Sequence, residues 1–194
     1  MIDLALSRAV DSRQLSVATP ERWQVEAKPG SFVARWRWFS AKALFLVPFT
    51  IFWNGIMVTM ALGATEGFKH PERMLVGLVI PHVWVGVGLA YYCLALFLNS
   101  TRVEFHDGKL EVHHGPVFWR GNRKLGVGEV QQLFVVEKRL NRSITYELCG
   151  LMRDGKRMTV LSGVDDEASA RFLEVRLEQA MNIRDQPVVG EMRR

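Results

Sequence analysis

The sequence predicts a two-helix membrane hairpin joined to a β-rich domain of antiparallel strands, which a C-terminal helix closes. Two apolar runs are each long enough to cross a bilayer, Asp-Gly turns separate segments of alternating polarity, and one amphipathic segment stands near the C-terminus. The expected parts are a tail at 1–20, a β-hairpin at 21–40 that docks on the later domain, a membrane hairpin at 41–98, a soluble domain at 99–184 and a tail at 185–194.

The two apolar runs exclude an ordinary soluble protein. Residues 41–63 hold one charged residue, Lys42, and residues 74–98 hold none when His82 is counted as neutral. About 20 apolar residues span a hydrocarbon core of about 30 Å, so each run is long enough. The first forty residues lack the apolar core of a cleavable signal peptide, and the first span is expected to stay in the mature protein.

Basic residues near the spans predict their orientation, because such residues concentrate on the cytoplasmic side of a membrane. The connecting loop at 64–73 holds only two basic residues, which two acidic ones accompany. Both termini are therefore expected in the cytoplasm. The flanking basic residues are Arg35, Arg37, Lys42, Arg102 and Lys109.

The soluble part begins with a predicted β-hairpin, TRVEFHDGKLEVHH at 101–114. Asp107 and Gly108 suit a two-residue turn, and side chains alternate between the faces of the two strands. The inner face is then apolar, and the outer face is polar. A similar hairpin is expected at 21–40 around Lys28-Pro29-Gly30-Ser31, with Trp36 and two further aromatic residues near the headgroups. The inner face consists of Val103, Phe105, Leu110 and Val112.

Further strands and one helix complete the domain. Residues 130–139 are rich in β-forming residues, and residues 143–153 lead through Asp154-Gly155 into a strand at 156–162. Asp165 is the expected N-cap of the helix, with acidic residues behind it that complement the positive helix end. The helix is expected to close an open barrel or curved sheet. Its apolar face consists of Phe172, Leu173, Val175, Leu177, Ala180 and Ile183.

This pattern resembles the bacterial pleckstrin-homology-like (PH-like) domains of small membrane proteins that carry a helical hairpin. The similar features are N-S-T-R after the second span, D-G-K-L-E-V followed by G-P, VQQLFVVEK, the Tyr146-x-Leu148 strand, and D-G-K ahead of M-T-V-L-S-G. They lie within residues 33–183. The resemblance implies a binding or scaffolding role in a bacterial cytoplasmic (inner) membrane, with no catalytic residue to carry over.

The outer face of the 101–114 hairpin is a candidate metal site, since carboxylates and imidazoles are ligands of zinc and other divalent ions. Neighbouring positions on a flat ribbon converge poorly on one point, however. We favour a solvated face on which Arg102 and Lys109 offset the carboxylates, and expect no metal and no cofactor. The four candidate ligands are Glu104, His106, Glu111 and His113.

Asn54 and His82 form a candidate intramembrane polar pair, because each lies about 12–14 Å from the outer end of its helix. Such residues are functional candidates by default, for example in a proton path. The alternative is one interhelical hydrogen bond, which we favour because no carboxylate accompanies the pair. Small residues at four-residue spacing could pack the hairpin or form a homodimer, and both readings remain open. They are Gly55, Thr59, Gly63, Gly86 and Ala90.

A basic and aromatic set is the candidate for binding anionic lipid headgroups or a protein partner. The alternative is an ordinary positively charged cytoplasmic flank with a solvated loop. The set consists of Arg35, Arg37, Lys42, Arg102, Phe118, Trp119, Arg120, Arg123 and Lys124.

The remaining function classes are disfavoured. The net charge of +5 is dispersed, since residues 101–194 hold 16 basic and 14 acidic residues, so no nucleic-acid footprint is expected. Phosphate-binding and nucleophile motifs are missing, which argues against an enzyme. Cys93 and Cys149 are expected to be reduced fillers. The sequence therefore favours a noncatalytic membrane-anchored adaptor, and the alternative is an accessory subunit of a transport or secretion assembly engaged through its membrane hairpin.

Overall fold

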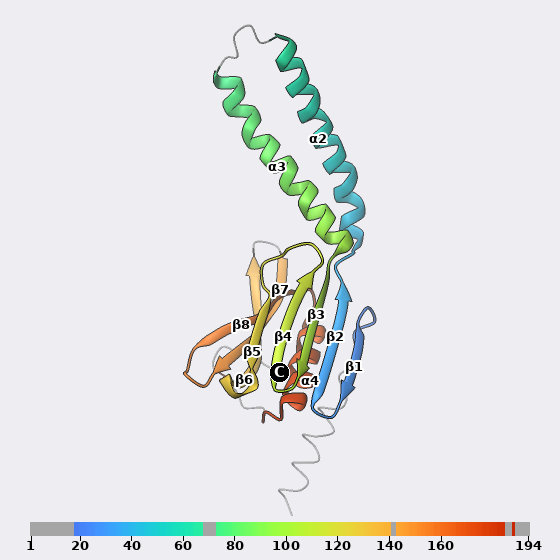
Figure 1. The fold of residues 1–194 in the computed structure, drawn as a ribbon. Helices are drawn as coiled ribbons and strands as arrows, with labels where there is room; N and C mark the ends of the chain where they lie inside the picture. The colour runs from blue at the N-terminus through green and yellow to red at the C-terminus, as the bar shows by residue number, and fades with distance from the viewer. Residues whose placement is uncertain (1–17, 68–72, 141–142, 185–187, 189–194) are drawn as a thin grey trace, which may run out of the picture. The chain divides into compact units, whose positions relative to one another are not determined.

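The computed structural model describes residues 18–67, 73–140, 143–184 and 188, so most of both expected tails lies outside the described residues. The chain divides into two compact units (Figure 1). The helical unit is Arg37–Ser100 with Gly115–Phe118, and the β-domain is the described part of the remainder.

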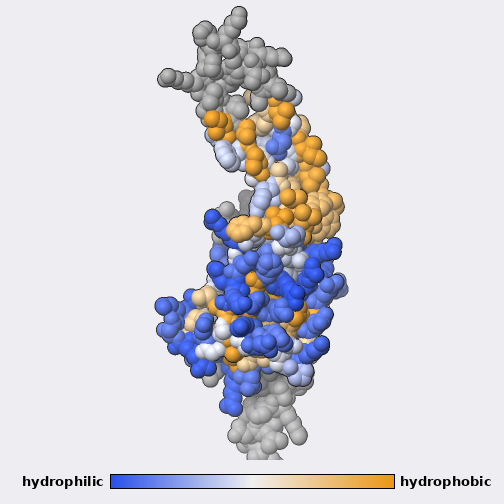
Figure 2. Space-filling model, viewed as in Figure 1, coloured by the Kyte–Doolittle hydropathy of each residue, from blue (hydrophilic) through white to orange (hydrophobic). Residues whose placement is uncertain are grey.

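The helical unit contains α2 (Ala41–Gly67) and α3 (Arg73–Leu98), which cover both predicted spans. At 1.5 Å per residue each helix is roughly 40 Å long, which exceeds the hydrocarbon core. Their apolar windows, Ala43–Met60 and Ile80–Leu98, are only 11% and 22% buried. Figure 2 shows hydrophobic residues along the surface of this unit. The prediction of two helices long and apolar enough to cross a membrane is confirmed, and they are not the buried helices of a soluble core.

Five strands form the first sheet of the β-domain, in the order β1-β2-β3-β4-β5. The N-terminal hairpin supplies β1 and β2, and β2 lies beside β3, so the hairpin is part of this sheet. β5 was not predicted, because it is short and contributes one buried apolar side chain, Leu125. The strands are β1 (Gln24–Lys28), β2 (Ser31–Arg37), β3 (Ser100–His106), β4 (Lys109–Gly115) and β5 (Arg123–Gly126).

The β3–β4 hairpin has the predicted two-residue turn. Asp107 and Gly108 have φ of +48° and +69°, and positive φ at both central residues is the requirement of a type I′ turn. Val103, Phe105, Leu110 and Val112 are at most 4% exposed, which confirms the inner face of the hairpin. The alternation of side chains in the sequence was sufficient to identify this face.

The β1–β2 hairpin turns where the sequence predicted, with Lys28 opposite Ser31. The Trp36 ring stacks on Trp23 at 4.1 Å between centroids, and Trp23 meets Phe172 edge-on. Trp36 therefore packs against the core of the β-domain. Its predicted position near the headgroups stays a prediction.

The second sheet contains β6 (Val130–Leu140), β7 (Ser143–Met152) and β8 (Arg157–Val164), in that order. The second Asp-Gly hairpin joins β7 to β8. The Met152 backbone N–H donates to the Lys156 carbonyl at 2.8 Å, and Gly155 takes φ of +81°. This is a three-residue loop with glycine at the left-handed position.

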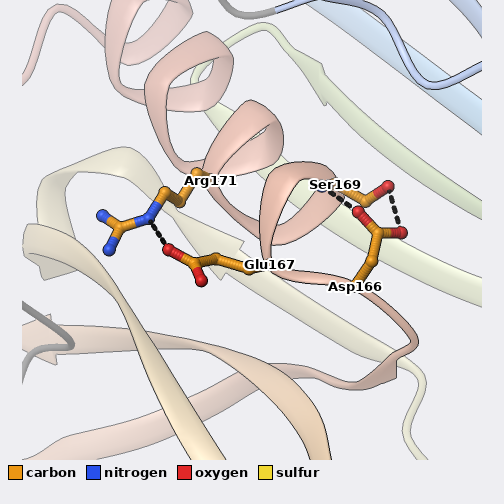
Figure 3. Close-up of polar contacts among 4 residues, drawn as sticks. All are labelled: Asp166, Glu167, Ser169 and Arg171. Carbon is orange, nitrogen blue, oxygen red and sulfur yellow. Dashed lines mark hydrogen bonds and ion pairs between the residues drawn. The ribbon is translucent and has the colours of Figure 1, made fainter. Parts of the chain in front are cut away.

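The C-terminal helix α4 (Glu167–Met181) begins one residue later than predicted. Asp166, not Asp165, is the N-cap, since its carboxylate accepts hydrogen bonds from the Ser169 backbone N–H and hydroxyl, both at 2.7 Å (Figure 3). The prediction was wrong because two adjacent aspartates suit the cap equally by residue type. Arg171 and Glu167 pair one turn apart at 2.8 Å.

The core of the β-domain lies between the sheets and α4, which contacts β6, β7 and β8. Phe172, Leu173 and Leu177 are fully buried, so the predicted face of the helix is confirmed at its centre. The two sheets do not close into one barrel, since no strand pairing joins them in the described chain. The 3-10 turn η1 (Val127–Glu129) interrupts the chain between β5 and β6.

Candidate functional site

The outer face of the first sheet holds the residues considered for metal binding. Glu104 pairs with Arg102 at 2.8 Å, and Glu111 pairs with Lys124 on β5 at 2.5 Å. No group of three or more His, Cys, Asp or Glu side chains suited to a metal ion occurs in the described residues. The carboxylates instead lie within a network of surface charges. The pairing of Glu111 with Lys124, which is opposite it in the β4–β5 register, needed β5 to be recognised.

The contact between Glu111 and Lys124 favours the ionised form of the Glu111 carboxyl. Hydrogen bonding to Lys124 lowers the pKa of the Glu111 carboxyl, so Glu111 is ionised across the physiological range. Exposed pairs of this kind contribute little to the stability of a fold, because water and salt screen them. Their effect is to fix the position of charges on the sheet.

The basic and aromatic set is divided between the two units. Arg35, Arg102 and Lys124 lie on β2, β3 and β5 of the first sheet, whereas Arg37 and Phe118 belong to the helical unit. All five side chains are exposed. The remaining positions are Trp119, Arg120 and Arg123 in the β-domain, and Lys42 in the first turn of α2, whose side chain is not described.

The segment Gly115–Phe118, which starts at the last residue of β4 and continues toward β5, belongs to the helical unit. Asn99 accepts from the Val117 backbone N–H at 2.7 Å and donates to the Val117 carbonyl at 3.0 Å. Further along α3, the Tyr91 hydroxyl donates to the Phe118 carbonyl. Sequence analysis missed this arrangement, because the bonded residues lie 18 and 27 positions apart and no local pattern joins them.

His114, at the end of β4, is buried in the β-domain beside the chain that returns to β5. Thr101 Oγ1 and His114 Nδ1 lie 2.9 Å apart, and Asn122 accepts from the His114 backbone N–H at 2.8 Å. Burial, with a smaller contribution from His113, lowers the pKa of His114. Gly121 has φ of +114°, and a Cβ there would lie 3.2 Å from His114 Nε2, so a glycine is required. His114 therefore contacts both Gly121 and Asn122 in the chain that leads to β5.

Asn54 and His82, the polar residues predicted to pair between the two apolar helices, make different contacts. The Asn54 amide donates to the Thr50 carbonyl of its own helix at 2.8 Å and to the Gly86 carbonyl of α3 at 3.3 Å. The His82 ring stacks on Trp53 at 5.7 Å between centroids. Asn54 therefore forms the interhelical hydrogen bond through Gly86, which supports the structural interpretation of this position.

The small residues do not act alike. A Cβ at Gly86 would lie 2.6 Å from Asn54 Oδ1, so Gly86 marks the close approach of the helices. A Cβ at Gly55 meets nothing within 4 Å, and the Thr59 hydroxyl bonds back to the Gly55 carbonyl at 3.1 Å. Gly55 and Thr59 thus lie on the exposed surface of α2 and do not pack the hairpin. The surroundings of Gly63, the third small residue of α2, are not described.

An open depression of about 430 Å³ lies at the C-terminal end of α4. Arg153 and Arg184 contribute cationic groups to its lining, beside the left-handed C-cap Asn182. The negative end of a helix disfavours an anion there, so this depression is a weaker candidate than the sheet face or the β4–β5 connection.

No protein-family model matches the chain, and no curated protein matches it in sequence. The structural features above are therefore the basis for the function proposed below.

Proposed function

We propose that the chain is a noncatalytic, membrane-anchored adaptor that presents a PH-like β-domain to a partner at the membrane surface. The observation that carries this proposal is the exposure of the helical unit. Its apolar windows are only 11% and 22% buried, while the β-domain has a continuous core of its own. A surface so apolar is unfavourable in water and favourable in lipid.

The proposed location is a bacterial cytoplasmic membrane, which the chain crosses twice, with both termini in the cytoplasm. The support is the excess of basic residues next to the ends of the helices that connect to β2 and β3. Arg37 stands four residues before α2 begins, and Arg102 stands four residues after α3 ends. The β-domain then lies on the cytoplasmic side.

The proposed contact surface is the outer face of the first sheet, and the partner class is a protein. Fixed charges of both signs, from Arg102 with Glu104 and Lys124 with Glu111, give this face a specific pattern. Charge complementarity of this kind orients a partner and excludes wrong ones.

The second candidate is an accessory subunit of a membrane assembly, or a homodimer, engaged through the helices. The observation that favours it is the exposed position of Gly55 and Thr59 on α2, since small residues allow close helix approach in lipid. Asn54 does not favour it, because its side chain donates to the Thr50 and Gly86 carbonyls within the hairpin.

Co-purification from native membranes after crosslinking tests the two candidates. The sheet variant carries Arg35→Glu with Arg102→Glu. Its control carries Lys138→Glu with Lys156→Glu, which are exposed and lie outside the first sheet, and the helix variant carries Gly55→Leu. We expect the sheet variant alone to lose the captured protein while its melting temperature stays near that of its control. Loss of the captured protein in the helix variant alone supports the accessory subunit and overturns the adaptor. Capture that is the same in every variant also overturns the adaptor.

A further inference from the structure

We propose that Gly115–Phe118 is an interfacial loop that inserts the Phe118 ring among lipid headgroups, and that Arg120 and Arg123, which follow it in the sequence, bind anionic phospholipid. The inference rests on the membrane anchoring proposed above and names the lipid class that the anchored protein would select. It assigns a ligand to the β4–β5 connection and the first residue of β5, Arg123, which does not share the outer sheet face with Glu111 and Lys124.

The first step is the attachment of the loop to α3. Asn99 holds Val117 through both its amide oxygen and its amide nitrogen, at 2.7 and 3.0 Å, and Asn99 is only 1% exposed. The Tyr91 hydroxyl holds the next carbonyl, that of Phe118. Three hydrogen bonds therefore keep this segment along the final turns of α3 within one compact unit.

The second step is depth. Tyr91 precedes the last residue of α3, Leu98, by seven positions, which is about 10 Å along the helix axis. The apolar window of α3 extends to Leu98. The polar layer on each side of a bilayer is roughly 5–8 Å thick, so a backbone bonded to Tyr91 reaches the level of the headgroups or below it.

The third step is the exposed Phe118 side chain. It is 76% exposed, although the backbone on either side is fixed. Other exposed aromatic rings belong to the same end of the helical unit, where Phe39 and Phe97 meet at 5.2 Å between centroids. Aromatic rings concentrate at this level of a membrane protein, so the surroundings of Phe118 match an interface.

The fourth step is charge. The run GPVFWRGNRK contains basic residues and no acidic one, and Arg120 and Arg123 are exposed. Lys124 is already paired with Glu111, whereas the two arginines follow Phe118 within five residues. Each basic residue close to an anionic surface strengthens binding about fivefold. An exposed aromatic ring followed by two arginines thus suits an anionic lipid surface.

Spin-label accessibility of the full-length protein in vesicles tests the insertion. Phe118→Cys, Val83→Cys and Asp154→Cys are labelled separately in a Cys93→Ala, Cys149→Ala background, in phosphatidylcholine with 30% phosphatidylglycerol. We expect the label at 118 to be shielded from a water-soluble relaxation agent like the helix label at 83, and the label at 154 to be fully accessible. Equal accessibility at 118 and 154 overturns the inference. If the label at 83 is also accessible, the membrane anchoring itself fails.

Lipid selection is measured by the phosphatidylglycerol retained by protein purified from these vesicles. Arg120→Gln with Arg123→Gln is expected to lower enrichment over phosphatidylcholine by roughly tenfold or more, following the fivefold effect per charge. The control, Lys156→Gln with Arg157→Gln, removes two exposed basic residues from the β7–β8 hairpin and should retain the enrichment. Equal enrichment in both variants, or loss in both, contradicts the proposed site. Capture of a protein by an accessible Phe118 loop would also overturn it.

Discussion

Single residues decide how closely the two helices approach and where the β-domain helix starts. Gly86 is needed because its missing Cβ leaves room for the Asn54 side chain, and Asp166 is needed because its carboxylate satisfies the first turn of α4. Residue type alone could not identify either position. Gly86 and Gly55 are both glycines within an apolar helix, and Asp165 and Asp166 both suit an N-cap. Only their contacts in the structure distinguish them.

Gly86→Ala is expected to destabilise the helical hairpin. A methyl group there displaces the Asn54 side chain and breaks its bond to the Gly86 carbonyl, at a cost of about 1 kcal/mol. Gly88→Ala is the matched control, since its Cβ meets nothing within 4 Å and alanine favours a helix. Thermal unfolding in detergent should show a lower midpoint for Gly86→Ala alone. Equal midpoints would show that Asn54 does not hold the helices together.

Asp166→Ala is expected to destabilise the β-domain by about 1 kcal/mol, the usual cost of losing an N-cap. Asp165→Ala is the control, because Asp165 is exposed and lies outside the cap contacts. Chemical denaturation of the full-length protein in detergent measures both. A larger effect at Asp165 would contradict the observed start of α4.

His114 is expected to make the β-domain less stable in acid. Its folded pKa is below the usual 6.5, so the unfolded chain binds more protons as the pH falls through and below 6.5. Stability is complete above pH 6.5 and is lost on acidification. His114→Gln should flatten the dependence of the melting temperature on pH between pH 7.5 and 5, because the glutamine side chain does not titrate. An unchanged slope in His114→Gln contradicts this role.

At the scale of elements, the hairpin turns were more predictable from the sequence than the short edge strand β5. Asp107-Gly108 and Lys28-Pro29-Gly30-Ser31 mark their hairpins, because tight turns require backbone conformations that only a few residue types favour. β5 left no such signal, because four residues with one buried side chain carry no periodicity. The attachment of Gly115–Phe118 to α3 depends on Asn99 and Tyr91, which lie 16 or more positions away in sequence, so local patterns could not reveal it.

Gly108→Ala should destabilise the β3–β4 hairpin, because φ of +69° is costly for any residue with a Cβ and Val127 Cγ1 would lie 3.4 Å from it. The expected loss is about 1 kcal/mol or more. Gly128→Ala is the control, as its surroundings are open. Amide exchange of the strands β3 and β4 reports the change directly. Equal protection in both variants would contradict the need for a left-handed turn.

At the scale of the whole molecule, the sequence predicted the parts better than their closure. Two apolar helices, β-hairpins and a C-terminal helix follow from composition and alternation, which are local properties. Whether the strands close into a barrel is a separate matter, since the described strands form two sheets and η1 lies in the chain between the last strand of one and the first of the other. Pairing across such a break is a long-range property that alternation does not encode.

The most direct test of membrane anchoring is thiol labelling of intact cells with a membrane-impermeant reagent. Lys69→Cys, in the sequence between the spans, and Asp154→Cys, in the β7–β8 loop, are compared in a Cys93→Ala, Cys149→Ala background. The account predicts that Lys69→Cys reacts in intact cells and that Asp154→Cys reacts only after the membrane is permeabilised. Reaction of Asp154→Cys in intact cells, or recovery of the full chain from plain buffer as a soluble protein, would contradict it.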